Sequence, residues 1–486
     1  MHTPRFLFLR SAVLSLALAG CSGGLVRTPT PLENHCDASC KALWSLDVGG
    51  TGASLVNAVG VDSAGNVVFE AVLSGDSTLG AGTGQSPETV LAKLDPTGTI
   101  LWKQTLPAGA GVPAMSVDAA GGIVLAGGSV VGEALDLGGG PIGSADPELS
   151  EIYVAALDAS GAPVMSRGLV AVPVAGEQSS DYVSPSQVVR APDGTLVVVG
   201  SFTGPLDFGD GALGSGNDDL VANVFVLKLD EAGDLLWSER FGTPAHPSGV
   251  VDDTSIFPAS VLVDGDGSIV LGLSLFGQVS LGGQIFSSAG LSDVLVARLD
   301  ASGGLVSAAT FGGPQNDAPL SMALGPDGTL FVAGYVGGPV QLGSFSLSVA
   351  ATASTTPFVA AIAPDGGVRW AVAPPQVPSP ETVGFTVGVA ATGDVVASLF
   401  DQGDGRVAVM QLDAADGTPS HVQTFTGTGA EDADQALALQ SSAVDPLGNL
   451  VLAGAFEGTI DFGTGAPITT PTPYGGHSAF VAKVGP

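Results

Sequence analysis

Basic residues are scarce in this sequence, and their scarcity argues against one class of partner. The 486 residues include 14 Lys and Arg against 47 Asp and Glu, which gives a formal net charge of −33. A surface with this charge repels phosphate groups. The sequence therefore predicts no nucleic-acid partner and no direct contact with an anionic membrane, although the acidity by itself also serves solubility.

The apolar run near the start of the chain is too short for a membrane span. Ser11 to Ala19 falls well below the roughly 20 residues that a helix needs to cross a bilayer. The run follows Arg5 and Arg10 and ends in Leu18-Ala19-Gly20-Cys21, a pattern that resembles the bacterial lipobox. The resemblance implies that residues 1–20 are a signal peptide and that Cys21 is acylated and becomes the new N-terminus. The alternative is an ordinary signal peptide with a chance cysteine.

Cysteine is also rare, with three copies in the chain. If Cys21 carries lipid, Cys36 and Cys40 remain, and an even pair in an oxidising compartment predicts a disulfide. A zinc site that adds His35 would lack a fourth ligand nearby. Residues 21–40 are therefore predicted to be a lipidated, flexible leader, and residues 41–486 the folded part.

Internal repetition dominates that folded part. A turn motif, Asp-x-x-Gly or Pro-Asp-Gly before an apolar β-branched run, recurs through the chain. Asp accepts backbone hydrogen bonds within such a turn, and Gly supplies a positive φ. The glycines of the seven copies are Gly65, Gly121, Gly194, Gly267, Gly328, Gly393 and Gly448.

A second motif alternates with the first and consists of an apolar strand, Leu-Asp, a Gly turn and another strand. Clear copies occupy 90–102, 153–165, 224–237 and 294–306, and weaker ones 358–370, 407–419 and 479–485. Two hairpins per repeat give four strands, which is the content of a propeller blade. The sequence thus predicts an all-β, seven-bladed β-propeller. A right-handed β-helix is the alternative, but it would need shorter and more uniform rungs.

The two ends of the repeat array predict how the ring closes. The last repeat stops after its third strand, at residues 479–485, while residues 41–50 match an outer strand with no repeat before them. We therefore expect the N-terminal strand to complete the seventh blade by pairing with residues 479–485.

These motifs resemble the bacterial β-propeller repeat family (SBBP-type) found in exported lipoproteins. The resemblance rests on Leu-Asp-x-x-Gly-x-x-x-Trp, on Gly-x-Phe-x-Gly-x-x-Asp-Phe-Gly and on Phe-Val-Ala-Lys, and it covers about residues 41–486. It implies the propeller fold and assigns no activity, because such families mostly lack one.

Every tryptophan occupies one position of the repeat. A Trp that recurs on the outer strand is expected to pack between blades and leaves none for stacking on a sugar in the loops. The element is similar to the tryptophan-docking motif of quinone-dependent dehydrogenases, but its Asp-to-Gly spacing is one residue shorter, so no quinone is expected. These four residues are Trp44, Trp102, Trp237 and Trp370.

Candidate catalytic and metal motifs are weak. Asp207-Phe208-Gly209 and Asp461-Phe462-Gly463 copy the metal-binding triplet of protein kinases, but no other kinase motif accompanies them, so both are interpreted as turns. Asp264 and Asp266 alternate with glycines as in a calcium loop, yet Leu275 stands where the bidentate Glu should be. Serine-hydrolase, zinc-protease and sialidase motifs are absent from the sequence, which predicts no catalytic residues and no cofactor.

The sequence thus predicts a non-enzymatic binding or scaffold module on the outer membrane, facing the periplasm or the exterior. Its loops, which vary most between the second and third strands, would hold an unknown protein or polysaccharide. Two alternatives remain: a carbohydrate-active enzyme using two loop carboxylates, and a calcium-stabilised surface scaffold.

Overall fold

The computed structural model describes residues 42–485 except for short stretches in the loops. The excluded positions are 51, 76, 80–86, 129–134, 144–149, 174–181, 205, 214–221, 243–254, 350–353, 375–381, 402–404, 429–436 and 471–476. The described residues belong to the unit Asn34–Pro486, and they contain no helix long and apolar enough to cross a membrane. The predicted signal peptide, the leader and Cys21, Cys36 and Cys40 lie outside them.

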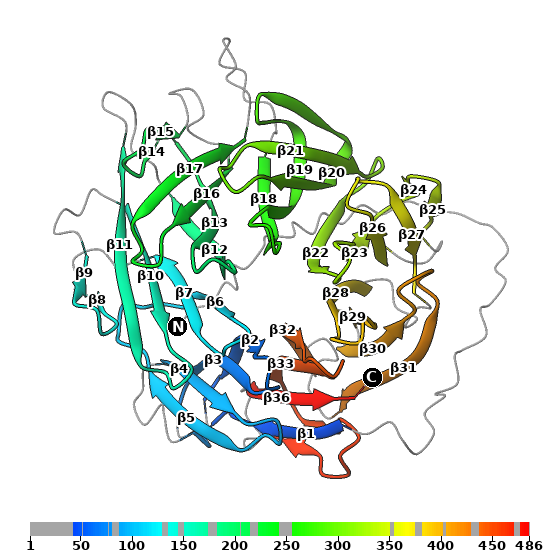
Figure 1. Cartoon of the computed structure of the whole chain (residues 1–486). Coiled ribbons are helices and arrows are strands. Elements are labelled where there is room, and N and C mark those ends of the chain that lie inside the picture. The colour runs from blue at the N-terminus through cyan, green and yellow to red at the C-terminus, as the bar shows by residue number, and fades with distance from the viewer. Residues whose placement is uncertain are drawn as a thin grey trace, which may run out of the picture. The chain divides into compact units, whose positions relative to one another are not determined.

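Seven antiparallel sheets surround a common axis, and each gives four strands to one blade (Figure 1). The predicted all-β, seven-bladed propeller is confirmed. Blade 1 contains β2 (Leu55–Val61), β3 (Val67–Leu73), β4 (Glu88–Leu94) and β5 (Ile100–Thr105). Blade 2 contains β6 (Ala114–Val117), β7 (Ile123–Gly128), β10 (Ser150–Leu157) and β11 (Pro163–Pro173). Blade 3 contains β12 (Val183–Arg190), β13 (Leu196–Phe202), β16 (Asn223–Leu229) and β17 (Leu235–Phe241).

The remaining blades repeat this order from the axis outward. Blade 4 contains β18 (Ser255–Val263), β19 (Ile269–Leu281), β20 (Gln284–Leu299) and β21 (Leu305–Phe311). Blade 5 contains β22 (Asp317–Leu324), β23 (Leu330–Val336), β26 (Thr356–Ile362) and β27 (Val368–Val372). Blade 6 contains β28 (Thr382–Val389), β29 (Val395–Asp401), β30 (Arg406–Leu412) and β31 (Pro419–Thr428). Blade 7 contains β32 (Leu437–Val444), β33 (Leu450–Phe456), β36 (Ser478–Val484) and β1 (Ala42–Asp47).

The first and last described strands close the ring, as predicted. β1 pairs antiparallel with β36, and the register places Ser45 opposite Ala482 and Asp47 opposite Phe480 (Figure 1). The side chains continue the contact, because the Ser478 hydroxyl donates to Asp47 Oδ1 at 2.6 Å.

The repeated Asp-x-x-Gly motif forms the turn between the first and second strands. In blade 1, Asp62 Oδ1 accepts the backbone N–H groups of Ala64 (3.0 Å) and Asn66 (2.9 Å). Gly65 follows with φ +80°, a conformation that side chains with a Cβ rarely adopt. The second strands then read as continuous apolar runs because neighbouring blades cover both of their faces. One apolar cluster accordingly joins Phe69 of blade 1 to Val481 of blade 7.

Short hairpins fill several connections that the sequence predicted only as loops. They lie between the second and third strands, outside the outer strands (Figure 1). Two of them pair with the outer strand of the preceding blade, β14 with β11 and β34 with β31. These hairpins are β8 (Leu135–Asp136) with β9 (Pro141–Ile142), β14 (Leu206–Asp207) with β15 (Ala212–Leu213), β24 (Val340–Leu342) with β25 (Phe345–Leu347), and β34 (Thr459–Ile460) with β35 (Ile468–Thr469).

Candidate functional site

The strands nearest the axis carry almost no charge. Among the inner strands, Arg190 and Asp317 are the charged residues; Arg190 pairs with Asp118 at 3.3 Å, and Asp317 is fully buried. Hydroxyl groups on the inner strands connect neighbouring blades. Ser441 Oγ of blade 7, for example, accepts the backbone N–H of Val59 of blade 1 at 3.1 Å. The inner strands therefore present little acid–base chemistry to a ligand on the axis.

The turns at one end of the ring hold many carboxylates, and these are occupied by the turns themselves. The hydroxyl of Ser160 and then backbone amides lower the pKa of Asp158, and the same contacts from Ser302 and the backbone lower the pKa of Asp300. These carboxylates are stabilised as anions by their own loops, so their recurrence follows from the fold rather than from a ligand.

The two calcium candidates follow the same rule. Asp264 accepts the backbone N–H of Gly265 at 2.7 Å and pairs with Arg298 at 3.0 Å. Asp266 accepts the N–H of Ser268 at 2.9 Å, and this contact lowers its pKa. Within the described ranges, no three His, Cys, Asp or Glu side chains gather closely enough to hold a metal.

The kinase-like triplets form turns in two of the short hairpins, β14–β15 and β34–β35. Asp207 Oδ1 accepts the N–H groups of Gly209 (2.7 Å) and Gly211 (3.1 Å), and Asp461 accepts that of Gly463 at 2.8 Å. Their carboxylates are thus used locally, and neither belongs to a group of three possible metal ligands among the described residues.

The tryptophans join each blade to the next. Trp44 Nε1 donates to the carbonyl oxygen of Pro96 at 3.0 Å, and Trp102 Nε1 donates to that of Ala159 at 3.1 Å. Trp237 and Trp370 repeat the contact with Ala301 (3.3 Å) and Ala414 (2.9 Å). Each acceptor lies in the turn before the outer strand of the following blade.

A set of buried cations escaped the sequence analysis. Lys93 in the third strand of blade 1 pairs with Asp62 at 3.0 Å, and Lys483 of blade 7 pairs with Asp445 at 2.7 Å. All four side chains are at most 4% exposed. One sequence signal could have found these pairs. In several repeats a Lys or Arg stands directly before the Leu-Asp of the second motif or the equivalent residues, and the same repeat has an Asp in its first turn.

Two buried acids face each other across the seam between blades 4 and 5. Asp317 Oδ1 and Oδ2 accept the N–H groups of Gly337 (2.9 Å) and Gly313 (2.6 Å), while Asp293 accepts that of Ala289 at 2.8 Å. Burial, and in smaller part the charge of Asp293, raise the pKa of Asp317 to about 6. Both are at most 2% exposed, so this coupled pair is shielded from a substrate.

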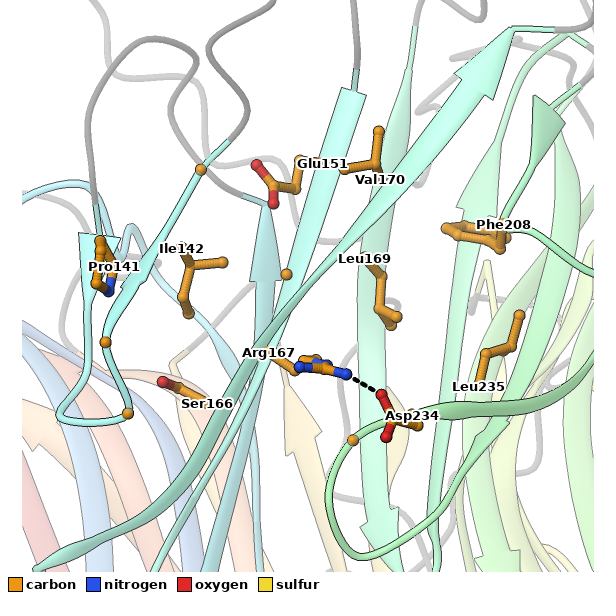
Figure 2. A pocket seen from close by; sticks show the side chains of 15 residues that line it. Pro141, Ile142, Glu151, Ser166, Arg167, Leu169, Val170, Phe208, Asp234 and Leu235 are labelled. Carbon is orange, nitrogen blue, oxygen red and sulfur yellow. Dashed lines mark hydrogen bonds and ion pairs between the residues drawn. The ribbon is translucent and has the colours of Figure 1, made fainter.

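An open cavity lies on the outer rim, where blade 2 meets blade 3 (Figure 2). It has a volume of about 730 Å³, within the range of small-ligand sites. Hairpin β8–β9 forms one wall, β11 the floor, and the turn before β17 together with Phe208 the opposite wall. We call this cavity the rim groove; its side chains include Ile142, Glu151, Ser166, Arg167, Leu169, Phe208, Asp234 and Leu235.

An ion pair crosses the rim groove. Arg167 on β11 reaches Asp234 in the turn of blade 3, and the two side chains remain 51% and 56% exposed (Figure 2). Water therefore screens the pair, and its contribution to stability is small. Its charges stay accessible to a molecule in the rim groove, next to the apolar side chains of Leu169 and Leu235.

Comparison with known proteins finds a distant likeness to solved structures and assigns the chain to no family. No protein-family model and no curated protein matches the chain. The streptogramin B lyase structure is 10% identical, with a TM-score of 0.44 over 91% of this chain and 98% of that one. The polysaccharide lyase Uly1 is 13% identical, with a TM-score of 0.46 over 88% and 89%. The Dos1 propeller is 12% identical, with a TM-score of 0.41 over 92% and 95%. At such identities the likeness says nothing about activity.

Proposed function

We propose that the chain is an exported binding module, tethered to the outer membrane through lipid on Cys21, and that it holds a partner in the rim groove without catalysing a reaction. Membership of the SBBP-type repeat family belongs to the same proposal. The rim groove supports it, because it combines a strand edge, apolar walls and the accessible charges of Arg167 and Asp234. No cofactor is required for this role.

The lipid anchor has a direct test. Mass spectrometry of the mature protein should find a diacylated or triacylated Cys21 at the N-terminus, and Cys21→Ser should release the protein from the membrane fraction. Ser22 in the next position favours the outer membrane, by resemblance to lipoprotein sorting in enterobacteria. An unmodified N-terminus elsewhere, or membrane attachment that survives Cys21→Ser, would contradict the tether.

The rim groove is tested with a matched pair of variants. Arg167→Ala removes the cation of the groove, while Arg369→Ala removes a similarly exposed Arg that pairs with Asp327 at 2.7 Å in blade 5. A displayed library of linear peptides and a glycan array, each probed with the mature chain, supply the ligands. Binding should weaken in Arg167→Ala and persist in Arg369→Ala; equal binding by both variants, or the absence of any ligand, would refute the proposal.

A carbohydrate-active enzyme is the second candidate, and one acid pair favours it. Glu239 on β17 lies near Asp210, and partial burial followed by the charge of Asp210 raises the pKa of Glu239. A glycosidase needs such an acid beside an ionised carboxylate. Asp210 is already held by the hydroxyl and N–H of Ser238, at 2.5 and 2.6 Å. Polysaccharide hydrolysis that disappears in Glu239→Gln would establish this alternative.

A further inference from the structure

The outer strand of blade 3 shows how this protein covers a sheet edge. Gly242, directly after β17, exchanges two backbone hydrogen bonds with Ser280 of blade 4, at 3.3 and 2.7 Å. Nearer the turn, the N–H of Ser238 donates to Asp210 in the hairpin of its own blade at 2.6 Å. The outward N–H groups of Ser238 and Gly242 therefore have partners within the protein itself.

The residues of β11 in blade 2 that are equivalent to Ser238 and Gly242 can be identified from the strand pairing. Trp237 lies opposite Lys228 and Met165 opposite Ala156, which are the residues before the last Leu of each third strand. Counting from these anchors, Ser166 corresponds to Ser238, and Val170 corresponds to Gly242. The hairpins align as well: Asp207-Phe208-Gly209-Asp210 matches 136–139, so Gly139 stands in the place of Asp210.

Blade 2 lacks both of the contacts that cover the edge in blade 3. Gly139 has no carboxylate to offer Ser166, whose buried Oγ has no hydrogen-bond partner among the described residues. The next blade's strand β14 also pairs farther along, with Val172 and Pro173 rather than with Val170. The stretch from Ser166 to Val170 borders the rim groove instead (Figure 2).

The backbone direction along this stretch follows from strand geometry. In an antiparallel strand, alternate residues direct both their N–H and C=O groups to the same side. Val172 pairs outward with Asp207 of β14, so Gly168 and Val170 also direct their N–H and C=O groups outward, into the rim groove. No described residue accepts a hydrogen bond from these two amides.

We propose that an extended peptide segment of a partner protein binds in the rim groove as an antiparallel strand added to the outer edge of β11. The proposal rests on the binding role proposed above and specifies its ligand. The added strand occupies the place that Ser280 takes in the neighbouring blade and continues the pairing that β14 begins. Its alternate side chains meet Leu235 and Phe208, which selects an apolar residue there. The net charge of −33 favours a neutral or basic segment over an acidic one.

The experiment uses linear peptides selected from a displayed library on the mature chain. Val170→Pro removes one outward N–H and leaves the β10–β11 ladder intact, because proline is tolerated on edge strands. Ala308→Pro places a proline at the matching edge of β21 in blade 4, at the position equivalent to Ser166, as the control. Circular dichroism and thermal melting verify that both variants fold.

Strand addition predicts three results. Val170→Pro weakens peptide binding about tenfold while Ala308→Pro leaves it unchanged, since one backbone hydrogen bond and its geometry are lost. N-methylation along the peptide weakens binding at every second residue. Hydrogen exchange at Gly168 and Val170 slows when peptide binds.

The opposite results separate the two proposals. If Arg167→Ala weakens binding but Val170→Pro does not, or if N-methylation shows no alternation, the rim groove binds peptide by another mode and strand addition is wrong. If neither Arg167→Ala nor Val170→Pro alters binding, the rim groove is not the binding site and the proposed function is wrong as well.

Discussion

Trp370 of blade 5 donates its indole N–H to the carbonyl oxygen of Ala414 in blade 6, and its ring lies against Gly417 in the same turn. The residue is 2% exposed, so the contact is part of the core between two blades. Trp102 makes the equivalent contact from blade 1 but stays partly exposed. The two positions thus share their geometry and differ in burial.

Trp370→Ala should therefore destabilise the fold more than Trp102→Ala. Loss of a fully buried Trp costs about 3 to 5 kcal/mol, and the partly exposed residue should cost less. Trp102→Phe, which keeps the ring contact and removes the hydrogen bond, should cost about 1 kcal/mol. Urea unfolding of the three variants measures these differences, and equal losses for the two Ala variants would contradict the burial argument.

The buried acids Asp293 and Asp317 predict a stability that depends on pH. The pKa of Asp317 is raised from 3.8 to about 6 in the folded state, so the folded protein favours the protonated acid. The stability due to this group is fully present below pH 3.8 and is lost as the pH rises through about 6. The loss amounts to about 3 kcal/mol. Thermal melts of wild type and Asp317→Asn from pH 4 to 8 should diverge across that window.

Another seam of the ring shows which residue can replace a buried acid here, namely serine. Where blade 7 meets blade 1, Ser478 and Ser54 occupy the equivalent positions, and Ser54 Oγ accepts the N–H of Ser74 as Asp317 accepts that of Gly337. Asp293→Ser should raise the free energy of unfolding at pH 8 by about 1 kcal/mol, since it removes an uncompensated buried charge. A destabilised Asp293→Ser protein at that pH would show that the seam needs both carboxylates.

The buried pair of Lys93 and Asp62 should be sensitive to the loss of one partner. Lys93→Met leaves the Asp62 carboxylate buried without its cation and should cost about 3 to 5 kcal/mol. Lys93→Met combined with Asp62→Asn should cost less than Lys93→Met alone. A double variant as unstable as the sum of the single variants would mean that the two side chains do not interact.

Chelation tests the turn at Asp264 and Asp266. Because a backbone amide and Arg298 occupy the first carboxylate and the Ser268 amide the second, EDTA should leave the melting temperature unchanged. Asp266→Ala should lower the melting temperature slightly, because the turn loses the hydrogen bond from the Ser268 N–H. A fall in melting temperature on chelation that disappears in Asp266→Ala would establish a calcium site.

The fold could be predicted from the sequence because its signals are local. Asp62 and Gly65 specify a turn wherever they recur, and Trp44 marks an outer strand that lacks a repeat of its own. The short hairpins between the second and third strands were not predicted, since strands of two residues, such as β14, show no periodicity.

The candidate site depends on relations that only register reveals. The sequence alone does not distinguish Gly139 from the other glycines of the chain, which has 72. Only its structural alignment with Asp210 shows that blade 2 lacks the carboxylate that binds Ser238 in blade 3. The rim groove also needs the length of β11, which moves the pairing of β14 from Val170 to Val172. The pairing of Lys93 with Asp62 was not predicted, because Asp62 lies in a turn of a different hairpin.

The closed ring is the central feature of this fold, and a disulfide across the closing strands tests it most directly. Ser45 and Ala482 lie opposite each other in β1 and β36, and their separation in sequence encloses nearly the whole propeller. A Ser45→Cys, Ala482→Cys protein, with Cys21, Cys36 and Cys40 changed to Ser, should form the bond on mild oxidation. The oxidised protein should then unfold at a higher temperature than its reduced form. For so long a loop, the disulfide should add about 4 kcal/mol to the free energy of unfolding. Failure of the two cysteines to join in the folded protein would contradict the closed seven-bladed ring.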